Sequence, residues 1–309
     1  MSMLFSLLIA LILAFLIGWI SQRMGMCLVK ASIQLLAGRP ALFIALTSCG
    51  LFGLMLTPLY RFTDNSLPLY SPGESYPLMV FGGGVFGVAS VMNNGCSLGT
   101  LTKFACGDFN KLFTMVGWVL AIFLWYYVDA AHEKKIVTVT DISSGNYWAL
   151  ISIIALVLIL LARVQGNKQL VLPSLLLGGL TSALYTFDPL WTPSTFFYKL
   201  SQFLSQENTT VTARSVAVFA MLMTGMLTFA IYEKKFCFEG FSPSKASVNL
   251  LAGVLMGAGA SMMLGGNDSQ ILLVFPNLTV DSSIPLVSIV VGILVSLWCK
   301  KLGVELNKN

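Results

Sequence analysis

Apolar runs about as long as a bilayer is thick recur along the whole of this chain of 309 residues. A helix needs roughly 17–25 apolar residues to cross the hydrocarbon layer, because it rises only about 1.5 Å per residue. A helix also satisfies its own backbone hydrogen bonds where no water is available. The sequence therefore predicts an all-α, polytopic membrane protein with nine spans, at about 3–22, 41–58, 78–93, 112–128, 147–164, 170–186, 213–232, 246–263 and 284–299.

The low proportion of charged residues excludes a soluble protein of this length. Only 10% of the residues are charged and 56% are hydrophobic, whereas soluble domains carry about 25% charged residues. A cleaved signal peptide is the alternative interpretation of the first run. No basic segment precedes that run, and no pair of small residues suited to cleavage lies before Arg23. We therefore expect the first run to be a membrane span.

The distribution of basic residues predicts the orientation in the membrane. With the N-terminus outside, most of the eighteen Lys and Arg residues fall on the cytoplasmic side, and the outer side holds only Arg61, Lys134, Lys135, Lys199 and Arg214. Asp188 and Asp268 are among the acidic residues expected outside. The net charge of +5 is assigned to cytoplasmic anchoring, so nucleic acid is not expected as a partner. We expect a multi-pass protein of the inner (plasma) membrane with a cytoplasmic C-terminus.

A glycine-rich segment occurs twice in the chain. Residues 82–96 read GGGVFGVASVMNNGC and residues 253–267 read GVLMGAGASMMLGGN, so a gap-free alignment places Cys96 on Asn267. Both segments end in residues that disfavour a continuous helix. Gly- and Ala-rich helices can resemble each other by composition alone, but here the single span 147–164 also reverses the direction of the second copy. The pattern predicts two inverted repeats with short re-entrant or broken helices that meet near the midplane.

These repeats divide the chain into four parts. We expect a first transmembrane repeat over residues 1–128 and a connecting span, which inverts the second half, over residues 129–169. The second, inverted repeat is expected over residues 170–300, and a cytoplasmic tail over residues 301–309.

The chain lacks the residue sets that common enzymes and pumps require. Its one histidine, His132, lies in a predicted outer loop, which excludes a multi-histidine metal site. There is no phosphate-binding loop and no Ser/His/Asp set placed for hydrolysis. Few acidic residues fall inside the predicted spans, so no carboxylate relay is predicted. We expect a transporter that is not an enzyme and that holds no cofactor and no metal.

Two of the six cysteines stand out by their context. Cys27 follows Gly25 just after the first run, and Cys96 lies on the glycine break, where a thiol is accessible to a substrate. Cys49 and Cys299 lie in apolar runs and are interpreted as small packing residues. None of the six lies in a predicted outer loop, so no extracellular disulfide framework is expected.

Three further residues are secondary candidates. Cys106 and Cys237 lie near the predicted cytoplasmic surface beside charged residues, and Lys30 follows Cys27 by three positions.

The motifs occur in a characteristic order. Gly25-Met26-Cys27 comes first, then residues 94–101 (NGCSLGTL), then residues 107–110 (GDFN). This order resembles the YeeE/YedE family of sulfur-transport proteins. The resemblance implies uptake of a small sulfur-containing ion, thiosulfate or a related sulfur or selenium species, along a pathway lined by cysteines. The family's third cysteine, in a Gly-Gly-Cys motif, is Asn267 here, so the resemblance leaves the ion itself open.

The chemistry of such a pathway can be stated from the residues. A small anion that leaves water for a weakly polar passage loses several kcal/mol of solvation. Backbone amides at Gly95 and Gly266 and weak, polarizable thiol donors can replace part of it without binding the ion too tightly. Asn267 adds a stronger donor. We expect Cys96 and Asn267 to face each other at the narrowest region, with Cys27 on the cytoplasmic side.

Two other functions are compatible with the sequence. In a membrane redox protein, Cys27 and Cys96 would exchange thiols or carry a persulfide. In a Cu(I) carrier, the same cysteines would bind the metal together with soft thioethers, at Met24, Met26, Met92, Met262 and Met263.

The expected partners are membrane lipid and, beyond the transported ion, a cytoplasmic sulfur-accepting protein. The basic loop with Lys234, Lys235 and Lys245 offers a contact for either, and lipid head groups are the simpler explanation.

Overall fold

The computed structural model describes residues 3–53, 67–70, 76–128, 136–139, 156, 163, 168–188, 191–205, 211–275 and 280–306. His132 and nearly all of the predicted span 147–164 lie outside the described residues.

In the first half of the chain, two long helices each lead through a short break into a half-length helix. The helices are α1 (Met3–Met24), α2 (Leu28–Leu36), α3 (Ala41–Gly53), α5 (Tyr76–Met92), α6 (Ser97–Ala105) and α7 (Lys111–Val128). Two short strands, β1 (Leu67–Tyr70) and β2 (Ile136–Val139), pair antiparallel, with Leu67 opposite Val139. The predicted all-α fold did not include these strands, which lie in two predicted outer loops.

The second half repeats the alternation of long and short helices. Its elements are α9 (Lys168–Phe187), α10 (Pro193–Leu204), α11 (Ala213–Tyr232), α12 (Pro243–Met262), α13 (Asn267–Ser269), the π-helical segment η2 (Gln270–Val274) and α14 (Val280–Leu306). α10 was not predicted, because the segment between spans 170–186 and 213–232 was interpreted as an outer loop. The sequence Thr192-Pro193-Ser194 was the missed signal, since an N-cap followed by proline commonly starts a helix.

Six of the described helices are long and apolar enough to cross a membrane, and α12 with the segment that continues it across a 42° bend would be a seventh. The chain is therefore a helical, multi-pass membrane protein. α3 covers only 13 residues, and the span 147–164 lies outside the described part. The count of nine spans stays a prediction.

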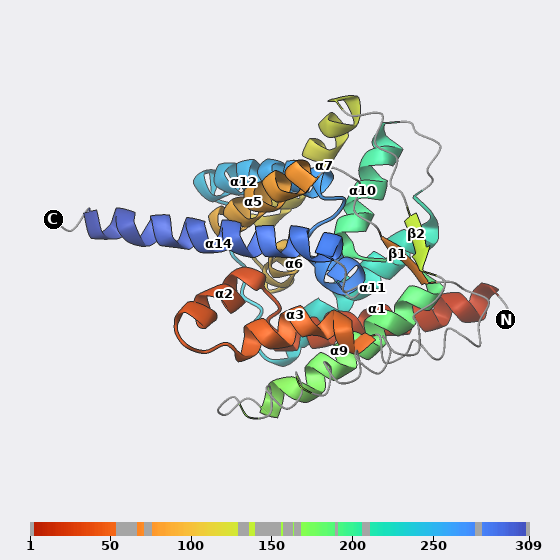
Figure 1. The fold of residues 1–309 in the computed structure, drawn as a ribbon. Coiled ribbons are helices and arrows are strands. Elements are labelled where there is room, and N and C mark those ends of the chain that lie inside the picture. Colours follow the sequence, from red (N-terminus) through yellow and green to blue (C-terminus); the bar gives the residue numbers. More distant parts are fainter. Residues whose placement is uncertain are drawn as a thin grey trace.

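The helices of the two halves pack in matching pairs. α1 packs on α11 and α3 on α9, while α5 packs on α14 and α7 on α12. Each helix of the first half has a counterpart in the second half: α9 for α1, α11 for α3, α12 for α5 and α14 for α7. When every helix is replaced by its counterpart, the pair α1–α11 becomes α3–α9, and the pair α5–α14 becomes α7–α12. Figure 1 shows α5, α7 and α12 in one group and α1, α3 and α9 in another, with α14 running between them toward the C-terminus.

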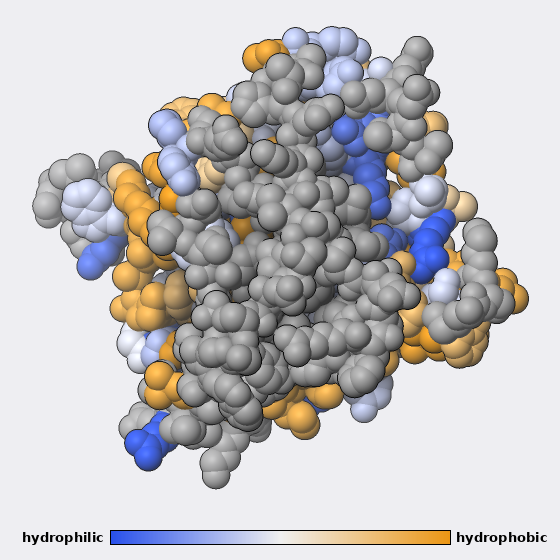
Figure 2. All heavy atoms as spheres, turned by 45° about the vertical axis from the view of Figure 1, so that its right-hand side comes forward, coloured by the Kyte–Doolittle hydropathy of each residue, from blue (hydrophilic) through white to orange (hydrophobic). Residues whose placement is uncertain are grey.

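Large apolar side chains cover the outer faces of the long helices. On α1 the exposed residues Leu4, Leu8, Ile12 and Leu16 recur every fourth position, and α7 and α14 carry similar stripes. Figure 2 shows hydrophobic side chains along the outer edges of the described helices. Such a surface would be costly in water and is suited to lipid. Polar groups are instead collected at the breaks between the helices.

Candidate functional site

Cys27 and Cys96 occupy equivalent backbone positions in the two breaks of the first half. Cys27 is the N-cap of α2, with φ −148° and ψ 116°, and Cys96 is the N-cap of α6, with φ −76° and ψ −170°. Before them, Gly25 (φ 60°) and Asn94 (φ 53°) take the left-handed conformation that turns the chain at each break. Each cysteine therefore stands at the electropositive end of a short helix.

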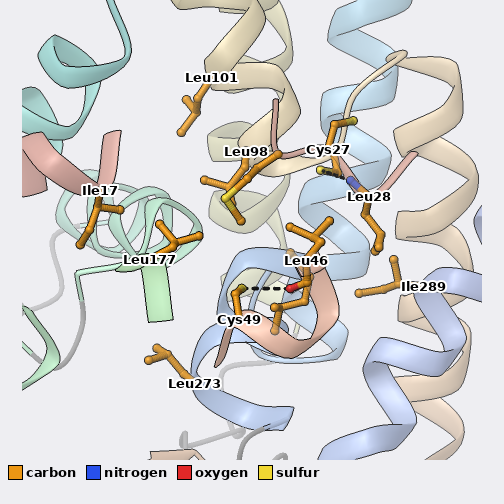
Figure 3. Packing of buried hydrophobic residues seen from close by; sticks show 14 of the residues in the cluster. Ile17, Cys27, Leu28, Leu46, Cys49, Leu98, Leu101, Leu177, Leu273 and Ile289 are labelled. Carbon is orange, nitrogen blue, oxygen red and sulfur yellow. Dashed lines mark hydrogen bonds between the residues drawn. The ribbon is translucent and has the colours of Figure 1, made fainter. Parts of the chain in front are cut away.

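The two thiols lie close together. A β-carbon at Gly99 would be near both Cys27 Sγ and Cys96 Sγ, and the backbone N–H of Leu28, the residue after Cys27, donates to Cys96 Sγ at 3.2 Å. Both cysteines are buried and neither forms a disulfide. Figure 3 shows Cys27 beside Leu28, with the bond from the Leu28 amide to a sulfur drawn as a dashed line. The structure thus brings together the two cysteines that the sequence singled out.

Cys49 has a different environment. Its thiol donates to the carbonyl of Leu46 in the same helix, at 2.9 Å, and the surrounding side chains are apolar (Figure 3). Such an intrahelical bond is the ordinary state of a buried cysteine that only packs.

Gly99 makes room for the thiol pair on α6. A β-carbon at this position would lie 2.6 Å from Cys27 Sγ and 3.6 Å from Cys96 Sγ. In the sequence, Gly99 stands out only as part of a motif. The structure assigns it a specific reason, because any larger residue would occupy the space next to both sulfurs.

Asn267 joins the second half to the thiol pair through Ser97, the residue after Cys96. Its Oδ1 accepts from the Ser97 backbone N–H at 3.0 Å and from the Ser97 hydroxyl at 2.5 Å. The Asn267 side chain is fully buried, and its Nδ2 has no hydrogen-bond partner within the described part of the chain. A buried donor without a partner is costly and is therefore available to an incoming acceptor.

Asp268 is buried beside Asn267, which corrects its predicted position on the outer side. Its exposed fraction is 0%. Oδ2 accepts from the backbone N–H of Ser194 at 2.9 Å, and Oδ1 lies 2.8 Å from the Ser97 hydroxyl. Asp188 is also mostly buried, with Lys199 at 4.0 Å. A carboxyl group inside a broken helix was missed because the whole segment after Gly266 was interpreted as an outer loop.

The hydrogen bonds around Ser97 are all satisfied when Asp268 carries a proton. The Ser97 hydroxyl has one hydrogen but lies within hydrogen-bond distance of two oxygens, Asn267 Oδ1 and Asp268 Oδ1. The Ser97 backbone N–H fixes the Asn267 atom as an acceptor. A protonated Asp268 donates to Ser97 Oγ, which in turn donates to Asn267. An ionised carboxylate would leave two acceptors in contact without a hydrogen between them.

Comparison with known families bears on this arrangement of half-helices and thiols. Residues 170–295 match the model of a family described as sulphur transport. The match supports a sulfur-transport protein of the YeeE/YedE type. A search of curated proteins found no match. The matched range begins at α9, so Cys27 and Cys96 lie before it and Asn267 lies within it.

The breaks of this chain correct the predicted register of its repeat. Gly266 is the N-cap of α13, with φ −79° and ψ −178°, as Cys96 is of α6. The backbone therefore aligns Cys96 with Gly266 and Ser97 with Asn267, one residue away from the gap-free sequence alignment. That alignment followed matching Ala-Ser pairs inside the helices, whereas the turn itself determines the correspondence. Ser97 and Asn267 are thus equivalent residues that bind each other.

No side chain fits at Gly266, the position that corresponds to Cys96. A β-carbon there would lie 2.8 Å from Asp268 Oδ1 and 2.9 Å from Trp118 Cη2. The second half therefore presents an amide and a carboxyl group, from Asn267 and Asp268, where the first half presents a thiol.

The motif at residues 107–110 ties two loops together. Gly107 has φ 105°, and a β-carbon there would collide with the carbonyl of Cys237. Asn110 is buried; its Oδ1 accepts from the Ser242 N–H at 2.9 Å and its Nδ2 donates to the Gly240 carbonyl at 3.2 Å. The glycine and the asparagine of this motif are thus explained by loop packing.

The secondary candidates lie at the same end of the molecule as these loops. Cys106 Sγ accepts from Gln22 Nε2 at 3.0 Å, and burial raises the pKa of the Cys106 thiol, which makes it a poor nucleophile at neutral pH. Cys237 is exposed, and its backbone N–H donates to the Cys106 carbonyl at 2.8 Å. Lys30 is exposed on α2, with its Nζ beside Gly25. Within the described residues, no three His, Cys, Asp or Glu side chains are grouped as a metal ion would require.

Proposed function

We propose that this protein imports a small sulfur-containing anion, thiosulfate or a related sulfur or selenium species, along a pathway through Cys27, Cys96 and Asn267. The observation that carries the proposal is the proximity of the two thiols, each of which belongs to the N-cap of a half-length helix. Gly95 and Gly266 belong to the breaks that bring these groups together. Asn267 supplies an unpartnered amide donor next to them.

The arrangement suits an anion that must pass and not remain. The N-termini of α2 and α6 supply partial positive charge without a full counterion. Thiols are weak donors with polarizable sulfur, so they replace part of the hydration shell at low affinity. A protonated Asp268 adds no negative charge that would repel the ion. A cluster of lysines at this buried place, away from water, would bind a dianion too strongly for rapid release.

We propose the two-repeat architecture as the frame of this pathway, with nine spans in all. The exchange of matching helix pairs between the halves supports it, as do the equivalent turns after α5 and α12. The proposed boundaries are residues 1–128 for the first repeat, 129–169 for the connection, 170–300 for the second repeat and 301–309 for the tail. The start of α1 and the end of α14 lie at opposite ends of the molecule (Figure 1), which supports an outer N-terminus and a cytoplasmic C-terminus in the inner membrane.

Growth on defined sulfur sources tests the proposal. The gene is expressed in cells that lack sulfur uptake, and one source at a time is supplied. We expect growth to be rescued by the transported ion, and rescue to be lost in Cys96→Ala. Cys49→Ala is the matched control, because it removes a buried thiol that lies in an ordinary helix. Normal uptake by Cys96→Ala would contradict a pathway through the thiol pair.

The proximity of the thiols also supports a second candidate, a persulfide carrier. In that case one thiolate of the Cys27–Cys96 pair would take the sulfane sulfur of an ion such as thiosulfate, with release of sulfite, and an external thiol would then remove that sulfur and restore the cysteine. Trapping the thiols by alkylation during active uptake separates the two functions. A transporter keeps both thiols reduced throughout, whereas a carrier accumulates a modified form.

A further inference from the structure

A cavity of about 540 Å³ lies between the ends of α5, α7 and α12 and the loops that carry Cys106 and Cys237. Both of these thiols line it, together with Asn93 and Asn94 from the break that precedes Cys96. The Nζ of Lys300, near the end of α14, donates to the Val91 carbonyl at 3.2 Å, so the cavity lies at the end of the bundle toward which α14 runs. The cavity thus connects the outside of the bundle with the break in front of the thiol pair.

The lining of this cavity is positively charged. It contains four lysines, Lys103, Lys111, Lys235 and Lys245, and two carboxylates, Asp108 and Glu239.

The carboxylates do not neutralise the innermost lysines by contact. Glu239 pairs with Lys245 at 3.2 Å, and Asp108 Oδ1 accepts from the N–H and the Nδ2 of Asn110. Lys103 Nζ donates to a neutral group, the Asn94 carbonyl, at 2.6 Å. The wall nearest the break therefore keeps a positive charge that a bound anion can balance.

Lys111 is the most deeply placed of the four. Its exposed fraction is 4%. An ammonium group has three hydrogens to donate, and those of Lys111 find three neutral oxygens: the Asn93 carbonyl at 2.5 Å, Asn93 Oδ1 at 3.1 Å and Asn249 Oδ1 at 3.1 Å. The lysine thereby holds the last carbonyls of α5 in place. Its charge extends into the cavity and the adjacent break, because amide oxygens do not cancel it.

Among the described residues, the positions equivalent to Lys111 and to its partners Asn93 and Asn249 in the other half carry no charge. Two carbonyls of α7, those of Thr114 and Trp118, approach Gly253 and Gly257 on α12. In the same way two carbonyls of α14, those of Pro285 and Ile289, approach Gly83 and Gly87 on α5. α7 is therefore equivalent to α14 at a fixed offset, and this offset places Ser282 at the position of Lys111. The alignment of Cys96 with Gly266 likewise places Met263 at the position of Asn93, and Met79 at the position of Asn249. The three uncharged counterparts, Ser282, Met263 and Met79, are all buried.

We propose that this cavity is a second anion site, in which the sulfur anion is received after it has passed the thiol pair. The inference rests on the proposed function, because it takes the transported anion as the ligand. Lys111 and Lys103 attract the anion to this end, and the solvated surroundings of the outer lysines allow its release. The two breaks have similar backbone geometry, but these lysines lie only at the end with the cavity. This difference favours movement of the anion from the thiol pair toward the cavity.

The first test measures anion binding without transport. Purified protein in lipid nanodiscs is alkylated at Cys237, which is exposed and lines the cavity, with iodoacetate or with neutral iodoacetamide, and the modified peptide is quantified. We expect the ratio of the iodoacetate rate to the iodoacetamide rate to be higher at Cys237 than for a free thiol in solution. Inorganic sulfate, an unreactive dianion, should slow the reaction with iodoacetate. Lys103→Gln and Lys111→Met should reduce the preference for iodoacetate several-fold.

Lys234→Gln is the matched control, since it removes a charge from the same loop outside the cavity lining. In uptake assays we expect Lys111→Met to slow transport about tenfold, the loss expected for a charge-assisted contact, and Lys234→Gln to have little effect. Lys103→Gln keeps the test valid if Lys111→Met fails to fold, because Lys103 lies at the surface.

The outcomes separate this inference from the proposed function. An equal alkylation preference in wild type, Lys103→Gln and Lys111→Met, with no protection by sulfate, overturns the second anion site even if sulfur uptake is observed. A preference for iodoacetate at Cys237 that the lysine substitutions reduce, together with protection by sulfate, supports the anion site. This holds even if the protein proves not to transport sulfur.

Discussion

Gly99→Ala is the smallest change that tests whether the thiol pair lies on the pathway. The new methyl group would lie 2.6 Å from Cys27 Sγ and about 3.0 Å from Cys27 Cβ. Carbon atoms in contact are normally about 3.5–4.0 Å apart, so the overlap with the sulfur is roughly 1 Å. Cys27 must turn away or α6 must move.

The cost of this overlap can be estimated. Overpacking of one methyl group in a dense interior costs about 1–3 kcal/mol. Because about 1.4 kcal/mol corresponds to a factor of ten, we expect uptake to fall roughly 5- to 150-fold if the ion must pass between the two thiols. The same overpacking should lower the thermal midpoint of the purified protein by only several degrees, and the amount of protein in the membrane should stay close to that of the wild type.

Uptake is measured in cells with the sulfur source identified by growth rescue, and normalised to the amount of protein in the membrane. Gly84→Ala is the control, because a β-carbon at Gly84 would have no atom within 4 Å. If Gly99→Ala transports as well as Gly84→Ala, the space beside Cys27 and Cys96 is not part of the route, and the assignment of the thiol pair is wrong.

Three further predictions follow from the second half of the site and from the topology. Asn267→Leu should reduce uptake about tenfold or more, because it leaves the Ser97 amide without its acceptor, at a cost of about 1–3 kcal/mol; uptake equal to wild type would make Asn267 a packing residue. Asp268→Asn should leave the thermal midpoint almost unchanged, because an amide can replace a protonated carboxyl group, whereas Asp268→Leu should lower it by several degrees; a large loss in Asp268→Asn would show that the carboxyl group is ionised. Reporter fusions should place the N-terminus outside and the C-terminus in the cytoplasm, and the same side for both ends would exclude an odd number of spans.

The membrane spans could be predicted from the sequence because hydropathy alone determines where a helix can cross lipid. The runs that became α1, α5, α7, α9, α11 and α12 were each predicted within a few residues, whereas α14 extends seven residues beyond the predicted end at residue 299. Short re-entrant or broken helices were predicted, but the ranges of α2, α6 and α10 were not. These helices are too short to be stable alone, and their buried packing against neighbouring helices stabilises them.

Part of the candidate site could also be predicted from the sequence. Cys27 and Cys96 were found because a thiol next to a glycine break is unusual in a membrane helix. Asp268 and Ser97 were missed, since their burial depends on contacts between segments about 170 positions apart in the chain. The predicted correspondence between Cys96 and Asn267 was wrong by one residue. Identical residues within two helices do not determine how many residues the following turn contains, and therefore do not determine which residue becomes the next N-cap.

The glycines at the crossings of the long helices have a mechanical consequence. Gly18 and Gly225 join α1 to α11, Gly87 and Gly292 join α5 to α14, and Gly117 and Gly253 join α7 to α12, in each case with a neighbouring carbonyl where a β-carbon would be. Sliding one helix by a turn would push a larger residue against that backbone. These crossings therefore behave as fixed joints, and the long helices form a stiff frame. The opening and closing that transport requires must come from the short helices that the frame surrounds, so a crosslink between two long helices should be tolerated, whereas one that immobilises α2 or α6 should stop the cycle.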